Sequence, residues 1–180
     1  MPSILGSLLL LAAAGAAQAA GTVQVSFVQP EKFADVRDSA YRAEDNLANL
    51  KRAIEEIGAK YVADGQTLKI DVLDVDLAGE PKRGSVRLYD VRVLRGRADW
   101  PTVQLRYTLE APDAPARTGA ARVADMAYLQ RLPIVYGDET LPYERRMLED
   151  WFRNEFGSAR ARAARSVGGR REVPYDGAAA

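Results

Sequence analysis

The segment Thr102-Val-Gln-Leu-Arg-Tyr-Thr-Leu-Glu110 decides the fold class, because its side chains alternate strictly between apolar and polar. Val103, Leu105, Tyr107 and Leu109 share one parity, and the residues between them are polar. Successive side chains of a β-strand point to opposite faces, so this pattern predicts a strand with one face in the core and one in solvent. Such a strand is typical of an antiparallel sheet that is covered on one side only.

A second long strand is predicted at Thr67–Asp76, where the alternation changes phase. Leu68, Ile70 and Val72 have one parity, whereas Leu73, Val75 and Leu77 have the other. A β-bulge near Leu73 would bring both sets to the buried face. Shorter strands are predicted at 23–27, 85–95 and 119–125, with polar connections at 79–84 and 111–119.

Two amphipathic helices are predicted on either side of these strands. The first runs from about Asp38 to Val62, with Asp38 or Ser39 as N-cap and Asp64-Gly65 as the closing turn. Its apolar stripe is Leu47, Leu50, Ile54, Ile57 and Tyr61. The second helix begins at Pro142 and is expected to end at Gly157. Its two apolar rows are Tyr143, Met147 and Trp151, and Leu148, Phe152 and Phe156.

The order of elements is therefore β-α-β-β-β-β-α, which predicts an α+β fold: a mostly antiparallel sheet of about five strands carrying two amphipathic helices. Residues 20–157 are expected to form this single domain. Residues 158–180 are rich in Ala, Arg and Gly and lack apolar periodicity. They include five arginines but only two acidic residues, so this segment has a net positive charge. This composition predicts a disordered tail, with contact to anionic lipid headgroups as the functional alternative.

Residues 1–19 are expected to form a secretory signal peptide. The apolar run from Ile4 to Ala17 leads into Ala17-Gln18-Ala19, the small-x-small pattern that signal peptidase recognises, and no charged residue precedes Glu31. The run is shorter than the ~20 residues that span a bilayer, which favours cleavage over a permanent anchor. A buried N-terminal core helix is the alternative. We expect a periplasmic or secreted protein with no stable membrane anchor after cleavage.

The composition of the 180-residue chain excludes several kinds of site. It contains no Cys and no His. Disulfides, Ser-His-Asp triads, Cys-His pairs and His-ligated zinc are therefore excluded, and any general acid or base must be a carboxylate, a Lys or a Tyr. The 25 basic and 25 acidic residues balance. An exported chain without a large basic face is a poor candidate for nucleic-acid binding.

The densest acidic group consists of Asp71, Asp74, Asp76 and Glu80. Asp74 and Asp76 are predicted to share one face of a strand, close enough to hold calcium, which prefers several oxygen ligands. The spacing is not that of an EF-hand loop, and a solvated strand face explains the same pattern. The same carboxylates are also candidates for a glycosidase-like acid–base pair.

Several segments, in order, resemble a bacterial periplasmic family, the domain of unknown function 3016. They are 30–35 (PEKFAD), 73–80 (LDVDLAGE), 90–95 (DVRVLR), 99–101 (DWP), 125–129 (DMAYL), 143–152 (YERRMLEDWF) and 155–156 (EF). The resemblance covers about residues 22–156 and leaves out the Arg-rich tail. It implies an exported, single-domain protein and implies no activity or site.

Nothing in the sequence amounts to a catalytic signature, so we expect a non-catalytic binding domain of the cell envelope. Its expected partner is an envelope protein or an envelope surface, with no cofactor and no nucleic acid. The alternative is a carboxylate-based hydrolase of envelope polymers, perhaps assisted by calcium, with Asp74 and Asp76 at its centre.

Overall fold

The computed structural model describes residues 20–36, 43–82, 91–112, 114–130 and 140–168. The expected signal peptide and the proposed N-caps Asp38 and Ser39 lie outside these residues. The elements, in order, are β1 (Thr22–Phe27), the 3-10 turn η1 (Pro30–Lys32), α1 (Ala43–Ala59), β2 (Thr67–Asp76), β3 (Glu80–Lys82), β4 (Val91–Val93), β5 (Thr102–Ala111), β6 (Ala114–Ala124) and α2 (Pro142–Gly168). None of the helices in this part of the chain is long and apolar enough to cross a membrane.

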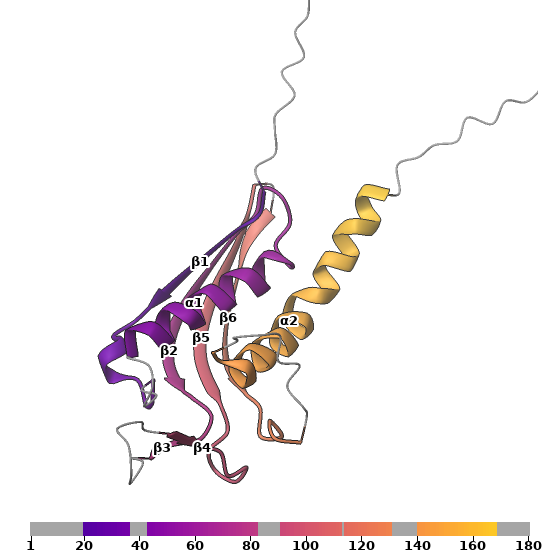
Figure 1. Cartoon of the computed structure of the whole chain (residues 1–180). Helices are drawn as coiled ribbons and strands as arrows, with labels where there is room; N and C mark the ends of the chain where they lie inside the picture. The colour runs from indigo at the N-terminus through magenta and orange to yellow at the C-terminus, as the bar shows by residue number, and fades with distance from the viewer. Residues whose placement is uncertain (1–19, 37–42, 83–90, 113, 131–139, 169–180) are drawn as a thin grey trace, which may run out of the picture.

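The main sheet has four strands in the order β1-β2-β5-β6, and β3 pairs with β4 in a separate two-stranded ribbon (Figure 1). β1 runs parallel to β2, whereas β2, β5 and β6 form an antiparallel meander. The predicted α+β class is thereby confirmed. The main sheet has four strands, where the sequence predicts about five. Its strand directions are mixed because the crossover through α1 makes β1 parallel to β2.

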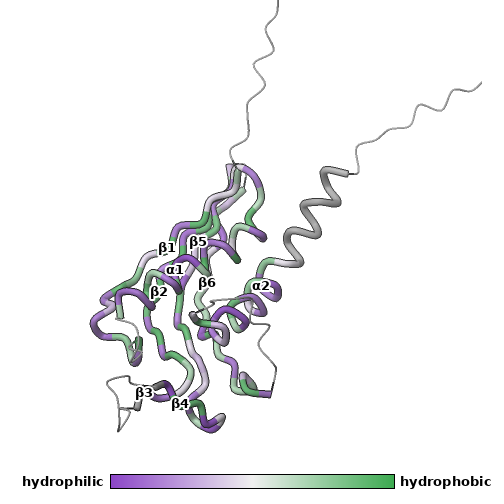
Figure 2. The backbone as a smooth tube through the Cα atoms, in the orientation of Figure 1, coloured by the Kyte–Doolittle hydropathy of each residue, from purple (hydrophilic) through white to green (hydrophobic). Residues whose placement is uncertain are grey.

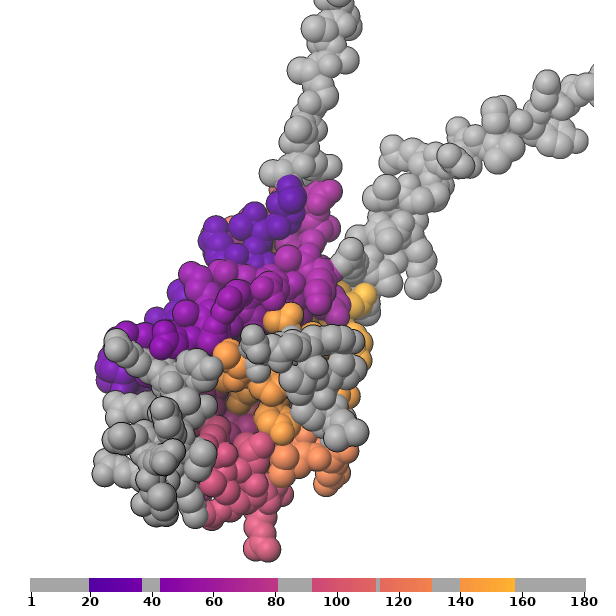
Figure 3. Space-filling model, in the orientation of Figure 1, coloured from indigo at the N-terminus to yellow at the C-terminus, as the bar shows by residue number. Residues whose placement is uncertain are grey.

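Both helices cover the same face of the sheet. In Figure 3, α1 spreads across this face and the first half of α2 lies beside it. Figure 2 shows apolar and polar positions alternating along β2 and β5, as expected for strands with one covered face. The inward side chains of β2 and β5 meet the apolar rows of the helices in one core, which includes Ile54, Ile57, Leu68, Ile70, Val103, Leu105, Leu148, Phe152 and Phe156. In the described part of the chain, the opposite face is mainly polar and neither helix packs on it (Figure 1); we call it the open face.

The predicted β-bulge in β2 is present. The register of β2 against β5 shifts between Val72 and Asp74, and Val72, Val75 and Leu77 are all buried. Leu73, however, is 38% exposed. The prediction that Leu73 joins the core is therefore wrong, because Leu73 is itself the extra residue that the bulge turns outward.

Two predicted connections contain strands. Glu80–Lys82, expected to be loop, pairs as β3 with Val91–Val93. Of the strand expected at 85–95, residues 85–90 lie outside the described residues, and Leu94 and Arg95 are not in a strand. β6 begins at Ala114 rather than near 119, so the link from β5 is much tighter than predicted. The first part of β6 contains Pro, Ala and Gly residues, which have little strand propensity of their own. Cross-strand pairing with the long strand β5 keeps them extended.

Both helix ends differ from the prediction. α1 ends at Ala59, three residues before Val62, and Tyr61 N–H bonds to the Gly58 carbonyl at 2.8 Å in a tightened last turn. Gly65 closes the connection with φ 77°, as its turn chemistry predicts. α2 continues through Gly157 to Gly168, so the predicted stop at Gly157 is wrong. The Ala and Arg residues that follow are strong helix formers and outweigh one glycine. Residues 169–180 of the predicted tail lie outside the described residues.

The two ends of the described chain lie toward the same end of the sheet. β1 begins, and α2 ends, at the top of Figure 1, whereas the β3–β4 ribbon and the start of α2 lie at the bottom. The turn that follows β2 and residues 140–144 at the start of α2 lie next to each other toward this lower end.

Candidate functional site

The turn that follows β2, residues 77–79, is the centre of the lower end of the sheet. Leu77 and Ala78 are buried, and Gly79 has φ 80°. A Cβ atom at Gly79 would lie 2.6 Å from Leu94 Cδ2 and 2.7 Å from the Val93 carbonyl oxygen. Both the positive φ and the close approach of β4 therefore require glycine at this position.

Arg92, on β4, binds the carbonyls of this turn. One guanidinium nitrogen, Nη1, donates to the carbonyl oxygens of Leu77 at 3.1 Å, Ala78 at 2.7 Å and Gly79 at 2.8 Å. The other, Nη2, donates to Asp35 Oδ2 at 3.1 Å in an ion pair that is largely shielded from solvent. A charged donor makes stronger hydrogen bonds than a neutral one, so Arg92 fixes the turn, the ribbon and the segment after η1 against one another.

Glu144 holds the same turn from the opposite side. Its Oε1 atom accepts the Ala78 N–H at 2.8 Å, and the residue is only 3% exposed. Glu144 lies in the first turn of α2, where the helix dipole favours a negative charge. The backbone of the turn is thus bound by a guanidinium group at its carbonyls and by a carboxyl oxygen at an amide.

Asp99 and Tyr128 complete the framework. The Gly79 N–H donates to the Asp99 carbonyl at 2.8 Å, and the Asp99 carboxylate accepts the N–H groups of Arg95 at 2.6 Å and Arg97 at 3.0 Å. Burial tends to raise the pKa of Asp99, but these hydrogen bonds outweigh it and hold the pKa below its ordinary value. Tyr128 is buried, packs edge-on against Tyr143 with ring centroids 5.2 Å apart, and accepts the Gly96 N–H.

A depression of about 180 Å³ lies between this turn and the start of α2. Most of its lining residues are apolar, and Arg92 and Glu144, which bind the turn, are also among them. It is lined by Leu77, Ala78, Arg92, Leu94, Thr140, Leu141, Pro142, Tyr143 and Glu144. We call it the α2 depression.

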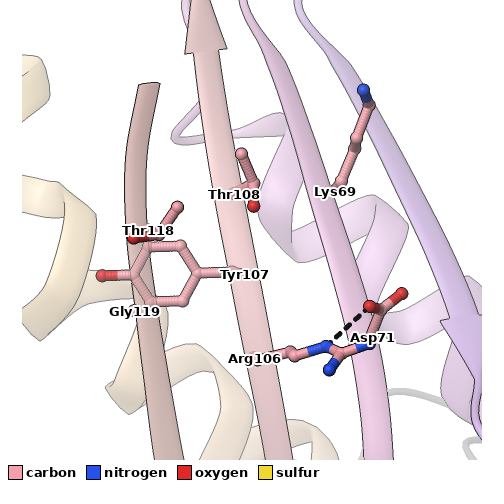
Figure 4. Close-up of a pocket in the computed structure, with 7 residues that line it drawn as sticks. All are labelled: Lys69, Asp71, Arg106, Tyr107, Thr108, Thr118 and Gly119. Carbon is pink, nitrogen blue, oxygen red and sulfur yellow. Dashed lines mark hydrogen bonds and ion pairs between the residues drawn. The ribbon is translucent and has the colours of Figure 1, made fainter. Parts of the chain in front are cut away.

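A broader hollow of about 400 Å³ lies on the open face of the sheet (Figure 4). Lys69, Asp71, Arg106 and Thr108 project from β2 and β5, and the hollow reaches Thr118 on β6. Asp71 accepts hydrogen bonds from Ser26 Oγ at 2.5 Å and from Arg106 Nε at 2.9 Å. These bonds, that of Ser26 first, lower the pKa of Asp71, so its carboxylate is ionised at neutral pH.

Family comparison assigns this arrangement to a known group of proteins. A family model described as a protein of unknown function, DUF3016, matches residues 21–154. The chain belongs to the DUF3016 family. The match covers the whole sheet and α2 as far as Asn154, and a search of the curated proteins found no match.

The segments that carry the family resemblance converge on the lower end of the DUF3016 domain. Segments 73–80 and 90–95 supply the 77–79 turn and Arg92, 99–101 supplies Asp99, 125–129 supplies Tyr128, and 143–152 supplies Glu144. No pattern in the sequence predicts a structural role for Arg92 or Glu144. The sequence signal that could have identified these two residues is that both lie in segments of the family resemblance.

The predicted calcium ligands Asp74 and Asp76 lie beside this framework, on the open face of the DUF3016 domain. Asp74 Oδ1 accepts the N–H groups of Ala34 and Val75, both at 2.9 Å, and its Oδ2 accepts from Gln104 at 3.3 Å. Within the described ranges no group of three or more acidic side chains is placed to hold a metal ion. Neither aspartate lines the α2 depression or the open-face hollow.

Burial and neighbouring charges nevertheless raise the pKa of Asp76 above its ordinary value. Loss of surrounding water is the largest cause, and the nearby charges of Asp35 and Asp74 add to it, against the opposing charges of Arg92 and Arg122. The Asp35 and Asp76 backbones are joined in a parallel bridge, which holds the two residues together. The fold therefore favours the protonated form of Asp76 more than water favours that of a free carboxyl group.

Proposed function

We propose that this protein is an exported, non-catalytic interaction domain of the cell envelope, and that its contact site is the α2 depression. One observation carries the proposal: the charged groups that surround the depression are used to hold backbone. Arg92 binds three carbonyl oxygens, and Glu144 binds the Ala78 amide. A hydrolase needs an acid or base within reach of its substrate, whereas these groups stabilise a fixed surface.

The size and lining of the α2 depression support a side-chain anchor rather than a whole small molecule. Ligand pockets generally have volumes of about 300–1,000 Å³, and this one has about 180 Å³. Leu77, Leu94, Leu141 and Tyr143 provide apolar walls. Protein interfaces often concentrate their affinity in one large side chain that fills such a cavity. We infer that a partner protein inserts an apolar or aromatic side chain here.

Exposed apolar side chains close to the depression fit the same role. Met126 is 70% exposed and Leu129 is 42% exposed, and both lie on the turn that carries Tyr128, whose ring packs on Tyr143. Exposed apolar residues that lie close together at one end of a domain are characteristic of binding surfaces. The expected export signal at residues 1–19 makes another envelope protein the proposed partner.

In-cell photo-crosslinking tests this proposal. A photoreactive amino acid replaces Leu129 or Tyr143 in the full chain, and Lys51 on the exposed side of α1 serves as the matched control. We expect one discrete crosslinked product from positions 129 and 143, none from position 51, and loss of that product when Leu141 is replaced by Glu in a chain that still folds. Equal products from all three positions, or none at all, would overturn the proposal.

The alternative function is a carboxylate-based hydrolase of envelope polymers, and the raised pKa of Asp76 is the observation that favours it. In that case, purified protein should degrade isolated cell-wall polymer, and Asp76→Asn should abolish the activity while Asp71→Asn retains it. Absence of turnover by the folded protein would remove this alternative.

A further inference from the structure

The two edges of the main sheet differ in how they are protected against pairing with another strand. β6, at one edge, contains Pro115 and the charged residues Arg117 and Arg122, and α2 packs beside it. Proline and charged side chains are the usual means by which edge strands avoid pairing. β1, at the other edge, has the sequence TVQVSF and contains neither.

The outer edge of β1 presents backbone groups that are ready to pair. Thr22 N–H donates to the Gln66 carbonyl and Val28 N–H to the Val72 carbonyl, both at 2.9 Å. Because strand residues alternate, the even-numbered residues of β1 direct their hydrogen-bonding groups toward β2, and Val23, Val25 and Phe27 direct theirs outward. Among the described residues, β1 pairs with β2 alone.

The side chains at this edge are also incompletely covered. Val23 and Phe27 face the helix layer but are only partly buried, at the margin of the core. Phe27 packs edge-on against Phe33, with ring centroids 6.2 Å apart. An additional strand beside β1 would cover both Val23 and Phe27.

We propose that β1 pairs antiparallel with β1 of a second copy of this chain, about a two-fold axis at Val25, to join the two sheets into one. In this register Val23 lies opposite Phe27, and Val25 lies opposite itself, so that each outward backbone group meets a partner. The pairing forms about six hydrogen bonds. It also places a β-branched residue against an aromatic one on the helix-covered face, which is a favourable cross-strand pair.

The open face is complementary in the same register. Gln24 lies opposite Ser26 of the second copy, and neither is charged. In the neighbouring strand, Lys69 is aligned with Gln24 and Asp71 with Ser26. The two-fold axis therefore places Lys69 of one copy and Asp71 of the other in the same cross-strand row, with the uncharged Gln24 and Ser26 between them, so that no like charges oppose each other in this row.

Cysteine crosslinking tests this pairing without interference, because the chain contains no Cys. Residues 24 and 26 form a non-hydrogen-bonded pair in the proposed register, with Cα atoms about 4.5 Å apart, which suits a disulfide. The test variant is Gln24→Cys with Ser26→Cys in the full chain. The matched control is Thr118→Cys with Ala120→Cys, the same spacing on the open face at the β6 edge.

We expect the unsubstituted protein to sediment with twice the mass of one chain, and the 24/26 variant to become a covalent dimer on mild oxidation at micromolar concentration. The 118/120 control and Gln24→Cys alone should stay unlinked, because position 24 faces 26 and not itself. A monomeric mass for the unsubstituted protein, or equal crosslinking of test and control variants that melt normally, would overturn the proposal. A dimer that crosslinks only through positions 118 and 120 would do so too.

Discussion

Glu144 Oε1 accepts the Ala78 N–H at 2.8 Å and thereby joins residues that are 66 positions apart in the chain. This bond links the first turn of α2 to the end of β2, at the side of the turn opposite to Arg92. It makes the floor of the α2 depression part of the structural framework, so changes there should affect stability in a defined way.

Replacing Glu144 by Ala should destabilise the protein by about 1–3 kcal/mol, because the Ala78 amide is left buried without its acceptor. Glu144→Gln retains an amide oxygen that can accept this bond and should cost less. Urea unfolding of both variants measures the difference. Equal losses for Ala and Gln would show that the charge of Glu144, rather than this hydrogen bond, supports the turn.

Gly79→Ala should also destabilise the protein, by about 1–3 kcal/mol, since the new Cβ atom is forced into a left-handed backbone conformation and against β4. Gly157→Ala is the matched control. Gly157 is helical, and a Cβ atom there meets nothing closer than 3.8 Å, so the substitution should stabilise α2 by about 0.5–1 kcal/mol. Thermal melts of the two variants should move in opposite directions.

The pH dependence of stability should change with opposite sign at Asp76 and Asp71. A raised pKa in the folded state means that Asp76 contributes stability below its unfolded pKa of about 3.8, which is lost as the pH rises through the folded pKa. Asp76→Asn should therefore raise the melting temperature at neutral pH, and this gain should disappear in acid.

Asp71 behaves in the reverse manner. Its pKa is lowered by Ser26 and Arg106, so its stabilisation is present above about 3.8 and is lost as the pH falls through the lower folded pKa. Asp71→Asn should lower the melting temperature at neutral pH and have little effect in strong acid. Melting curves from pH 2 to pH 8 for both variants test the pair, and shifts of the same sign would contradict it.

Calcium should not stabilise the protein at millimolar concentration. Asp74 Oδ1 already accepts two backbone N–H groups, so holding an ion through this oxygen would compete with the bond from Ala34 that fixes β2 to the segment before Asp35. Melting with calcium and with chelator measures this. A clear rise with calcium that Asp76→Asn removes would support the metal site predicted from the sequence.

Removal of residues 158–180 should leave the melting temperature unchanged, because the last described core side chain of α2 is Phe156. The matched comparison is Phe152→Ala, which removes a fully buried ring that stacks on Tyr61 and should cost about 3–5 kcal/mol. A large loss on truncation would indicate that the end of α2 contributes to packing.

The strands could be predicted where the sequence itself has a period. β2 and β5 could be predicted closely because apolar and polar residues alternate along both strands, and the one change of phase in β2, at Leu73, indicates the bulge. The end of α2 was missed because helix propensity beyond Gly157 depends on many small contributions. β3 and the early start of β6 were missed because pairing with a neighbour, rather than local preference, makes those residues extended.

The candidate site was harder to predict for a different reason. Asp74 and Asp76 attracted attention because they are close in sequence, whereas Arg92, Glu144 and Asp99 come from separate segments and meet only through the fold. Their partners are backbone groups, which leave no pattern in the sequence. The family resemblance is the sequence feature whose segments include all three of these residues.

The position of the chain ends has a practical meaning for how the domain is presented. β1 begins and α2 ends at the pole of the sheet opposite to the 77–79 turn (Figure 1). A tether, fusion partner or immobilising tag joined directly before β1 or directly after α2 would therefore hold the domain by its far pole and leave the α2 depression pointing outward. If this domain were attached to a surface in that way, the α2 depression would be held away from the surface by the full length of the sheet.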